Sequence, residues 1–130
     1  MKLLSTKISI SFEGKYAPKD QRFIDLYKQV LRGEIPYYWG LVKTKAIKPF
    51  SDFKPEITEV DKKLFFNQLA KNDFPSLHVY EQGDEFVMSD DYKKFYFYLE
   101  LGWKEIPCYI IGKTSNKSVA DLTEVKLKRE

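Results

Sequence analysis

The chain of 130 residues and 15.4 kDa has the size of one domain, residues 1–130, and can bury a core without disulfides or structural metals. Its 22 basic and 19 acidic residues are interspersed and leave a net charge of +3, which is too balanced to indicate nucleic-acid binding. A single cysteine excludes an internal disulfide, and a single histidine excludes a His/Cys metal site. No apolar segment has the length of a signal peptide core or a membrane span, so we expect a cytoplasmic protein without membrane binding.

The first third of the chain predicts a strand followed by a helix. Residues 5–14 (STKISISFEG) alternate apolar and polar side chains, which is the period of a half-buried strand. From Phe23 onward, residues 17–34 repeat apolar side chains at helical spacing, with Asp20 as a candidate N-cap and Gly33 as a left-handed stop. We therefore expect an amphipathic helix in this segment.

The middle of the chain predicts a strand and a second helix. Three prolines in residues 34–59 exclude a continuous helix there, and residues 41–47 (LVKTKAI) alternate as a strand does. Residues 59–75 predict a helix with Asp61 near its start and Pro75 after its end. Its expected buried face consists of Val60, Leu64, Phe65 and Leu69.

A hairpin is predicted next. Residues 75–89 (PSLHVYEQGDEFVMS) indicate two short strands around the turn sequence QGD. Alternation in the first strand places Leu77 and Val79 on one face and sends His78 and Tyr80 to the other. We expect His78 to be a surface or partly covered strand residue, because the sequence identifies no acidic or cysteine partner for it.

The last predicted elements are a helix, a strand and a polar tail. Residues 90–102 (DDYKKFYFYLELG) predict a third helix that ends at Gly102, and residues 104–112 (KEIPCYIIG) predict a buried strand of about five residues. Cys108 in this strand is expected to pack as a small apolar residue. In the tail, residues 113–130, we expect a surface helical turn or more.

The order of these elements is that of an α+β fold, and three motifs add a family resemblance. They are KAIKPF, KLFFNQLAKNDFPSLHVYEQGDEFVMSDDYKKF and LELGWKEIPCYIIG. Over residues 41–112 the chain resembles the ParB N-terminal and sulfiredoxin-like superfamily, the ParB-like nuclease domains. The resemblance implies a small mixed sheet with about three packed helices. Outside it lie an N-terminal strand–helix extension over residues 1–40 and the polar tail over residues 113–130.

The same resemblance implies a phosphate site at the start of the third helix. Asp90 matches the aspartate of the family's D-G-x-H-R motif, and Asp91 replaces its glycine. Tyr92, Lys93 and Lys94 occupy the three positions that follow. In the family this turn holds a nucleotide phosphate with backbone N–H groups and cationic side chains, which implies phosphate binding by Lys93, Lys94 and Tyr92. Asp91 departs from the pattern, because a carboxylate stands where glycine lets the backbone approach an anion.

Two uses of the paired carboxylates stay open at this point. Asp90 and Asp91 are candidates for holding Mg²⁺, with ligand phosphates completing its coordination shell. Together with Ser89 they are also good N-cap or first-turn residues, whose oxygens accept hydrogen bonds from helix amides. Lys93 and Lys94 are in the same way either a phosphate clamp or a solvated helix face.

Aromatic residues make up 16% of the chain, which indicates a ring-rich core or binding face. The third helix contains five rings on more than one side, which are Tyr92, Phe95, Tyr96, Phe97 and Tyr98. We expect about half of them in the core. The others, with Tyr37, Tyr38 and Trp39, are candidates for a surface that stacks nucleic-acid bases or binds a protein.

These observations lead to two main hypotheses. The first is binding of a nucleotide or another phosphate ligand at the N-terminus of the third helix, with Mg²⁺ as a candidate cofactor and catalysis undecided. The alternative is a non-catalytic protein-interaction module, for example a phage or mobile-element accessory or inhibitor protein, that kept the fold and lost the nucleotide site. Nucleic-acid binding is a third hypothesis, which the dispersed charge disfavours. Sulfiredoxin chemistry is not expected, since Tyr92 stands where that family has its nucleophilic cysteine.

Overall fold

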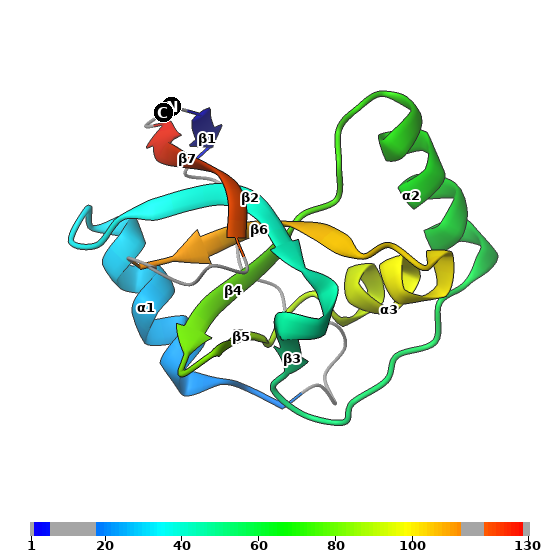
Figure 1. Cartoon of the computed structure of the whole chain (residues 1–130), viewed down its shortest axis with the longest axis horizontal. Coiled ribbons are helices and arrows are strands. Elements are labelled where there is room, and N and C mark those ends of the chain that lie inside the picture. The colour runs from blue at the N-terminus through cyan, green and yellow to red at the C-terminus, as the bar shows by residue number, and fades with distance from the viewer. Residues whose placement is uncertain (1, 6–17, 113–118, 129–130) are drawn as a thin grey trace.

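Seven strands pair into one mixed sheet in the computed structural model, which describes residues 2–5, 18–112 and 119–128, and side chains within residues 18–112 (Figure 1). In chain order the described elements are β1 (Lys2–Ser5), α1 (Gln21–Leu31), β2 (Tyr37–Lys43), the short 3₁₀ turn η1 (Thr44–Ala46), β3 (Ile47–Pro49), α2 (Glu59–Ala70), β4 (Leu77–Gln82), β5 (Glu85–Met88), α3 (Tyr92–Leu101), β6 (Glu105–Ile111) and β7 (Val119–Lys128). The predicted α+β class, a small mixed sheet with three helices, is therefore confirmed. No helix in the described ranges has both the length and the apolarity needed to cross a membrane.

The order of the strands in the sheet is β1-β7-β2-β6-β4-β5-β3. β6 lies between β2, its antiparallel neighbour, and β4, its parallel neighbour. In this register Tyr109 of β6 pairs with Trp39 of β2 on one side and with His78 of β4 on the other. These three rings consequently form one row across three adjacent strands, which matters for the site described below.

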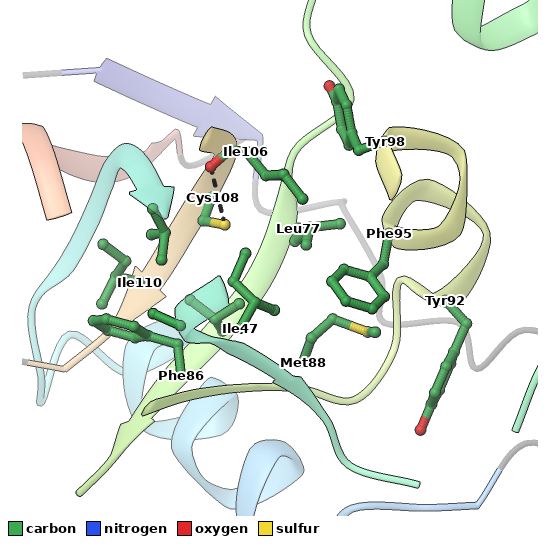
Figure 2. Packing of buried hydrophobic residues seen from close by; sticks show 13 residues of the cluster. Ile47, Leu77, Phe86, Met88, Tyr92, Phe95, Tyr98, Ile106, Cys108 and Ile110 are labelled. Atoms are coloured by element: carbon green, nitrogen blue, oxygen red, sulfur yellow. Dashed lines mark hydrogen bonds between the residues drawn. The ribbon is translucent and has the colours of Figure 1, made fainter. Parts of the chain in front are cut away.

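Different helices cover the two faces of the sheet. α3 packs on one face, where Phe95 and Tyr98 join a buried cluster that includes Leu77 of β4. Figure 2 shows Phe95 projecting from α3 toward the strands. α1 packs on the opposite face, where Phe23 joins a second cluster that includes Tyr37. Helices on both faces leave the central strands with two buried sides, so the strands carry apolar residues at nearly every position.

The predicted hairpin and its alternation are confirmed. β4 and β5 pair antiparallel, and Gly83 in the turn between them has a φ of +63°, which favours glycine. Leu77 and Val79 belong to the α3-side cluster, whereas Tyr80 belongs to the α1-side cluster. The period of two was enough to predict these directions, because side chains of a strand alternate whatever covers each face.

Cys108 of β6 packs as the small apolar residue that was predicted. It is fully buried in the α3-side cluster, and its Sγ donates to the carbonyl of Ile106 at 3.4 Å (Figure 2). Burial raises the pKa of the Cys108 thiol well above its ordinary value, and the negative charge of Asp91 raises it further. The thiol is therefore protonated and unreactive at neutral pH.

α1 begins and ends where its sequence signals predict. The Asp20 carboxylate accepts hydrogen bonds from the amides of Arg22 and Phe23 at 3.1 and 3.3 Å. Gly33 follows the helix with a φ of +74°. The other carboxylate oxygen of Asp20 accepts from the hydroxyl of Tyr80 at 2.6 Å. Because Asp20 is buried, this cap also anchors the start of α1 to β4.

α2 does not bury the single face that its sequence predicts. Phe65 packs against Phe97 of α3 with ring centroids 4.6 Å apart, and Leu69 in the last turn reaches the α3-side cluster. Val60 and Leu64, however, are 68% and 57% exposed. This part of the prediction was wrong because α2 stands beside α3 and away from the sheet, so only the face that carries Phe65 and Leu69 has a partner to pack on (Figure 1).

The rings of α3 are more deeply buried than predicted. Four of the five are buried, which are Tyr92, Phe95, Phe97 and Tyr98, and Tyr96 is partly buried. We expected about half of them in the core. The difference arises because α3 lies between two partners, the sheet on one side and α2 on the other.

The segment predicted as one strand over residues 41–47 is divided. β2 ends at Lys43, and η1 turns the chain before β3 begins. The amide of Thr44 donates at 2.9 Å to the carbonyl of Lys104, which precedes β6. This long-range hydrogen bond stabilises a corner that alternation alone does not reveal.

The two ends of the chain were harder to predict. Of the strand predicted over residues 5–14, only Ser5 lies in a described element, β1, and residues 6–14 lie outside the described residues. The helical turn expected in residues 113–130 is wrong for Val119–Lys128, which forms β7, and the rest of that tail lies outside the described residues. β7 pairs with β2 and β1, and backbone pairing of this kind stabilises a strand even where the sequence is polar.

Candidate functional site

The predicted phosphate site lies at the first turn of α3, where Asp91 occupies the N-cap position. Its carboxylate makes no capping hydrogen bond to the helix. One carboxylate oxygen accepts from the backbone N–H of His78 at 2.7 Å and lies 3.3 Å from His78 Nδ1. The other oxygen accepts from Lys94 Nζ at 3.2 Å. Of the two uses left open for Asp91, capping of the helix by its side chain does not occur, because β4 and Lys94 offer the carboxylate stronger partners than the helix amides.

Burial and charge act in opposite directions on Asp91. Removing the carboxyl group from water raises its pKa, but the positive charge of Lys94 and the hydrogen bonds from His78 lower it by more. The net result is an Asp91 pKa well below the ordinary range of aspartate. Asp91 is therefore a buried carboxylate that Lys94 largely neutralises.

Lys94 is the one predicted phosphate-binding residue that lies in this polar cluster. Its ammonium donates to Asp91 and, at 3.3 Å, to the carbonyl of Ser76, and its side chain is 31% exposed. An ammonium has three N–H donors, so these two bonds hold the group in position and leave capacity for one further acceptor. Lys94 is therefore anchored by the protein and still in contact with solvent.

The other two predicted phosphate-binding residues lie elsewhere. Lys93 points toward α2, where its Nζ is 3.3 Å from the carboxylate of Asp61. Tyr92 is fully buried on the α3 side of the sheet, and its hydroxyl shares a hydrogen bond of 2.9 Å with Ser51. The structure thus brings Asp91 and Lys94 together and separates them from Lys93 and the Tyr92 hydroxyl.

His78 is the partly covered strand residue that was predicted, and it has an acidic partner that the sequence did not identify. Asp91 contacts both its backbone and its ring, and the His78 side chain is only 15% exposed. Tyr37 stacks on His78 at 6.2 Å between ring centroids, and Tyr109 packs on it at 5.4 Å. One signal for this partner was present in the sequence. Asp91 stands where the D-G-x-H-R motif has glycine, and a buried carboxylate needs a hydrogen-bond donor nearby, which His78 on the adjacent hairpin can supply.

Trp39 extends the same region along the row of rings across β4, β6 and β2. Its indole N–H donates to Ser76 Oγ at 3.1 Å, and the carbonyl of the same serine accepts from Lys94. Trp39, Tyr109 and His78 are all intermediate in exposure, between buried and exposed. We call Lys94, Asp91, His78, Tyr109 and Trp39 the ring-and-lysine site. It combines a fixed cation with partly exposed aromatic rings.

The two candidates for metal binding are buried. Asp90 is 8% and Asp91 is 6% exposed, and Ser89, which was a candidate for capping only, is fully buried beside them. Among the side chains that the structure describes, no three or more His, Cys, Asp or Glu residues gather as a metal site. Any Mg²⁺ held by Asp90 and Asp91 would therefore need ligand phosphates for most of its coordination shell, as the sequence analysis assumed.

Comparison with known proteins does not assign the chain to a family. No protein-family model matches the sequence. A search of curated proteins likewise finds no match.

Proposed function

We propose that the protein is a ParB-like domain that binds a nucleotide or another phosphate-bearing ligand at the start of α3. One observation carries the proposal: the Asp91 carboxylate is turned away from the first-turn amides of α3 and toward β4, and it holds Lys94 at the same end of the helix. First-turn amides and the positive end of the helix dipole favour an anion there. Had the Asp91 side chain capped those amides, it would have occupied the place of the ligand.

The rings of the site support a nucleotide over a bare phosphate. Trp39, Tyr109 and His78 lie in register across three strands, and Trp39 and Lys94 both bond to Ser76. A base can stack on partly exposed rings while its phosphates reach the lysine and the helix amides. The carboxylates of Asp90 and Asp91 oppose this binding, so we expect it to be weak without Mg²⁺ and stronger with Mg²⁺ bound to the phosphates.

Isothermal titration tests the proposal with ATP, CTP, ADP and GTP, each with and without Mg²⁺. Lys94→Gln should weaken the best ligand by about tenfold or more, because one charge-assisted contact is lost. Lys93→Gln is the matched control, since Lys93 has a similar exposure of 33% but pairs with Asp61 on the α2 side. A flat trace for all four nucleotides up to about 1 mM, or equal losses in both variants, discards the proposal.

A second candidate is the non-catalytic protein-interaction module, as expected of a phage or mobile-element accessory or inhibitor protein. The described residues include eight exposed large hydrophobic side chains, and six of them lie between residues 60 and 101. The six are Val60, Leu64, Phe66, Phe74, Leu99 and Leu101. Such a concentration on α2, the loop that follows and the end of α3 is typical of a protein-binding surface.

The two candidates are separated by combining two results. Flat nucleotide titrations, together with a partner whose capture is lost in Val60→Lys/Leu64→Lys, favour the interaction module. Both residues are more than half exposed, so their replacement should leave folding intact. Nucleotide binding that depends on Lys94 favours the first candidate.

A further inference from the structure

A cleft of about 660 Å³ lies at the other end of α3, between η1 and the corner where α3 meets β6. Its apolar floor is formed by Ile47, Phe95, Leu99 and Trp103. Ile47 and Phe95 are buried parts of the core, whereas Leu99 is 41% exposed. This volume is within the usual range for ligand pockets and accommodates one or two side chains of a partner.

Two hydrogen bonds hold the walls of the cleft together. The hydroxyl of Thr44 donates to the carbonyl of Trp103 at 2.7 Å, and the amide of Thr44 donates to the carbonyl of Lys104 at 2.9 Å. They join η1 to the end of α3 across a large separation in sequence. The cleft is therefore preformed, which reduces the entropy cost of binding.

The rim of the cleft is basic. Lys43, Lys45 and Lys104 line it and are exposed, and Glu105 is the acidic residue of the lining. Lys43 and Lys45 flank Thr44, and Thr44 bonds to the backbone of Lys104, so the three lysines come from adjacent backbone segments. Three ammonium groups around an apolar floor are complementary to a ligand that is both acidic and apolar.

We propose that this cleft binds an acidic segment of another protein, with an aliphatic or aromatic anchor side chain on the apolar floor and flanking carboxylates on the three lysines. An anchor in a preformed pocket surrounded by a polar rim is the common arrangement of energetically important interface residues. The lysines select a negatively charged partner and speed its association, and the apolar floor supplies most of the binding affinity.

One feature favours a peptide over a nucleotide or nucleic acid at this end of α3. Glu105 repels a multiply charged phosphate group more than it repels single, spaced carboxylates.

The test uses fluorescein-labelled synthetic peptides and the complete, unmodified chain, with fluorescence anisotropy as the measurement. The three probes are a glutamate-rich peptide with a central leucine, the same peptide with serine in place of leucine, and a lysine-rich version with the leucine kept. We expect saturable binding of the first peptide only, with an affinity that falls as salt is raised. An oligothymidylate and ATP are measured in the same way, as the alternative ligands.

Matched variants locate the binding to the cleft. Lys43→Glu/Lys104→Glu should weaken the acidic leucine peptide by about tenfold or more, and Leu99→Ser by about fivefold. Leu101→Ser is the control for the floor, since Leu101 is on the same helix and 38% exposed but lies in a separate depression beside α2. Lys28→Glu/Lys63→Glu is the control for charge, because these two exposed lysines lie on α1 and α2. Both controls should bind within about twofold of the unmodified chain.

Three outcomes would overturn the proposal. The first is that no peptide binds saturably up to about 1 mM. The others are that the cleft and control variants lose peptide affinity equally, or that the oligothymidylate or ATP binds more tightly than the peptide and does so through Lys43 and Lys104. The melting temperature of each variant shows whether it remains folded. The inference is independent of the nucleotide proposal, since Lys94→Gln should leave peptide binding unchanged and the cleft variants should leave nucleotide heats unchanged.

Discussion

At its N-terminal end α3 carries a carboxylate and a lysine that are paired and largely covered, whereas its C-terminal half borders a cleft whose lysines are exposed. Asp91 is 6% exposed and bonds to Lys94 and His78. Lys43 and Lys104, in contrast, project from the rim of an apolar cleft. Lysine side chains therefore occur in two different physical states near the two ends of one helix, Lys94 on α3 itself and Lys43 and Lys104 on the segments beside it.

The difference teaches how charge at each end contributes to the protein. A buried ion pair must be complete, because removing one partner leaves an uncompensated charge away from water. Exposed lysines contribute little to folding, because water and salt screen them. We therefore expect the N-terminal cluster to control stability and the C-terminal cleft to control binding of an acidic partner. The following predictions test this division, from the largest expected effect to the smallest.

Asp91→Ala should destabilise the protein by about 1–3 kcal/mol, because the His78 N–H loses its buried acceptor and the partly exposed Lys94 loses its counter-charge. Urea unfolding at pH 7 measures the change. Asp25→Ala is the control, since Asp25 is an exposed aspartate on α1 and its loss should cost less than about 0.5 kcal/mol. Similar losses in both variants would contradict the structural role assigned to Asp91.

The stability of the protein should fall in acid because of Asp91. Its pKa in the folded protein is lowered, so its contribution is complete above the unfolded value near pH 4 and is lost as the pH falls toward the folded value. Below about pH 4 the slope should be about 1.4 kcal/mol per pH unit from this group alone.

Urea unfolding of the unmodified chain and of Asp91→Asn at a series of pH values isolates this contribution. The asparagine variant is less stable at pH 7, and its deficit should shrink as the pH falls below 4. A deficit that stays constant down to about pH 2.5 would show that Asp91 has an ordinary pKa.

Thr44→Val should cost about 1 kcal/mol, because it removes the hydrogen bond from Thr44 to the Trp103 carbonyl in the wall of the cleft. In a domain of this size that change lowers the melting temperature by roughly 3–5 °C. Thr44→Ser keeps the hydroxyl and should recover most of the loss. If serine is no better than valine, the hydroxyl is not what joins the two walls.

Lys43→Ser/Lys104→Ser should change the free energy of unfolding by less than about 0.5 kcal/mol. Denaturant unfolding of this variant and of the unmodified chain measures the change. A loss of more than about 1 kcal/mol would mean that these lysines stabilise the fold, and the contrast between the two ends of α3 would then fail.

Much of the fold was accessible from the sequence because its signals are local. The caps of α1, the turn of the hairpin and the stop of α3 at Gly102 each depend on a few neighbouring residues. The predicted alternation of β4 is correct for the same reason. By comparison, the packing of α2 and the formation of β7 depend on which distant element is available. The predicted burial of Val60 and Leu64 on α2 and the helical turn predicted where β7 forms were therefore both wrong.

The candidate site was only partly accessible. Residues 90–94 were singled out, and Asp91 and Lys94 do meet there. Which way the Asp91 carboxylate turns was beyond prediction, since helix amides and a strand N–H compete for it and only the fold places His78 within reach. The cleft went unnoticed because Lys43 and Lys104 are distant in sequence and become neighbours only when η1 bonds to the backbone beside β6.

By itself the sequence determined the α+β class, α1, the hairpin, the start and end of α3 and the buried strand β6, because caps, turns and hydrophobic periodicity act over a few residues. Only the tertiary structure decided that Asp91 pairs with His78 and Lys94, that α2 leaves Val60 and Leu64 exposed, and that three lysines surround one apolar cleft. The physical reason is that burial and charge pairing depend on distances in space, and those distances exist only once the strands have paired and the helices have packed.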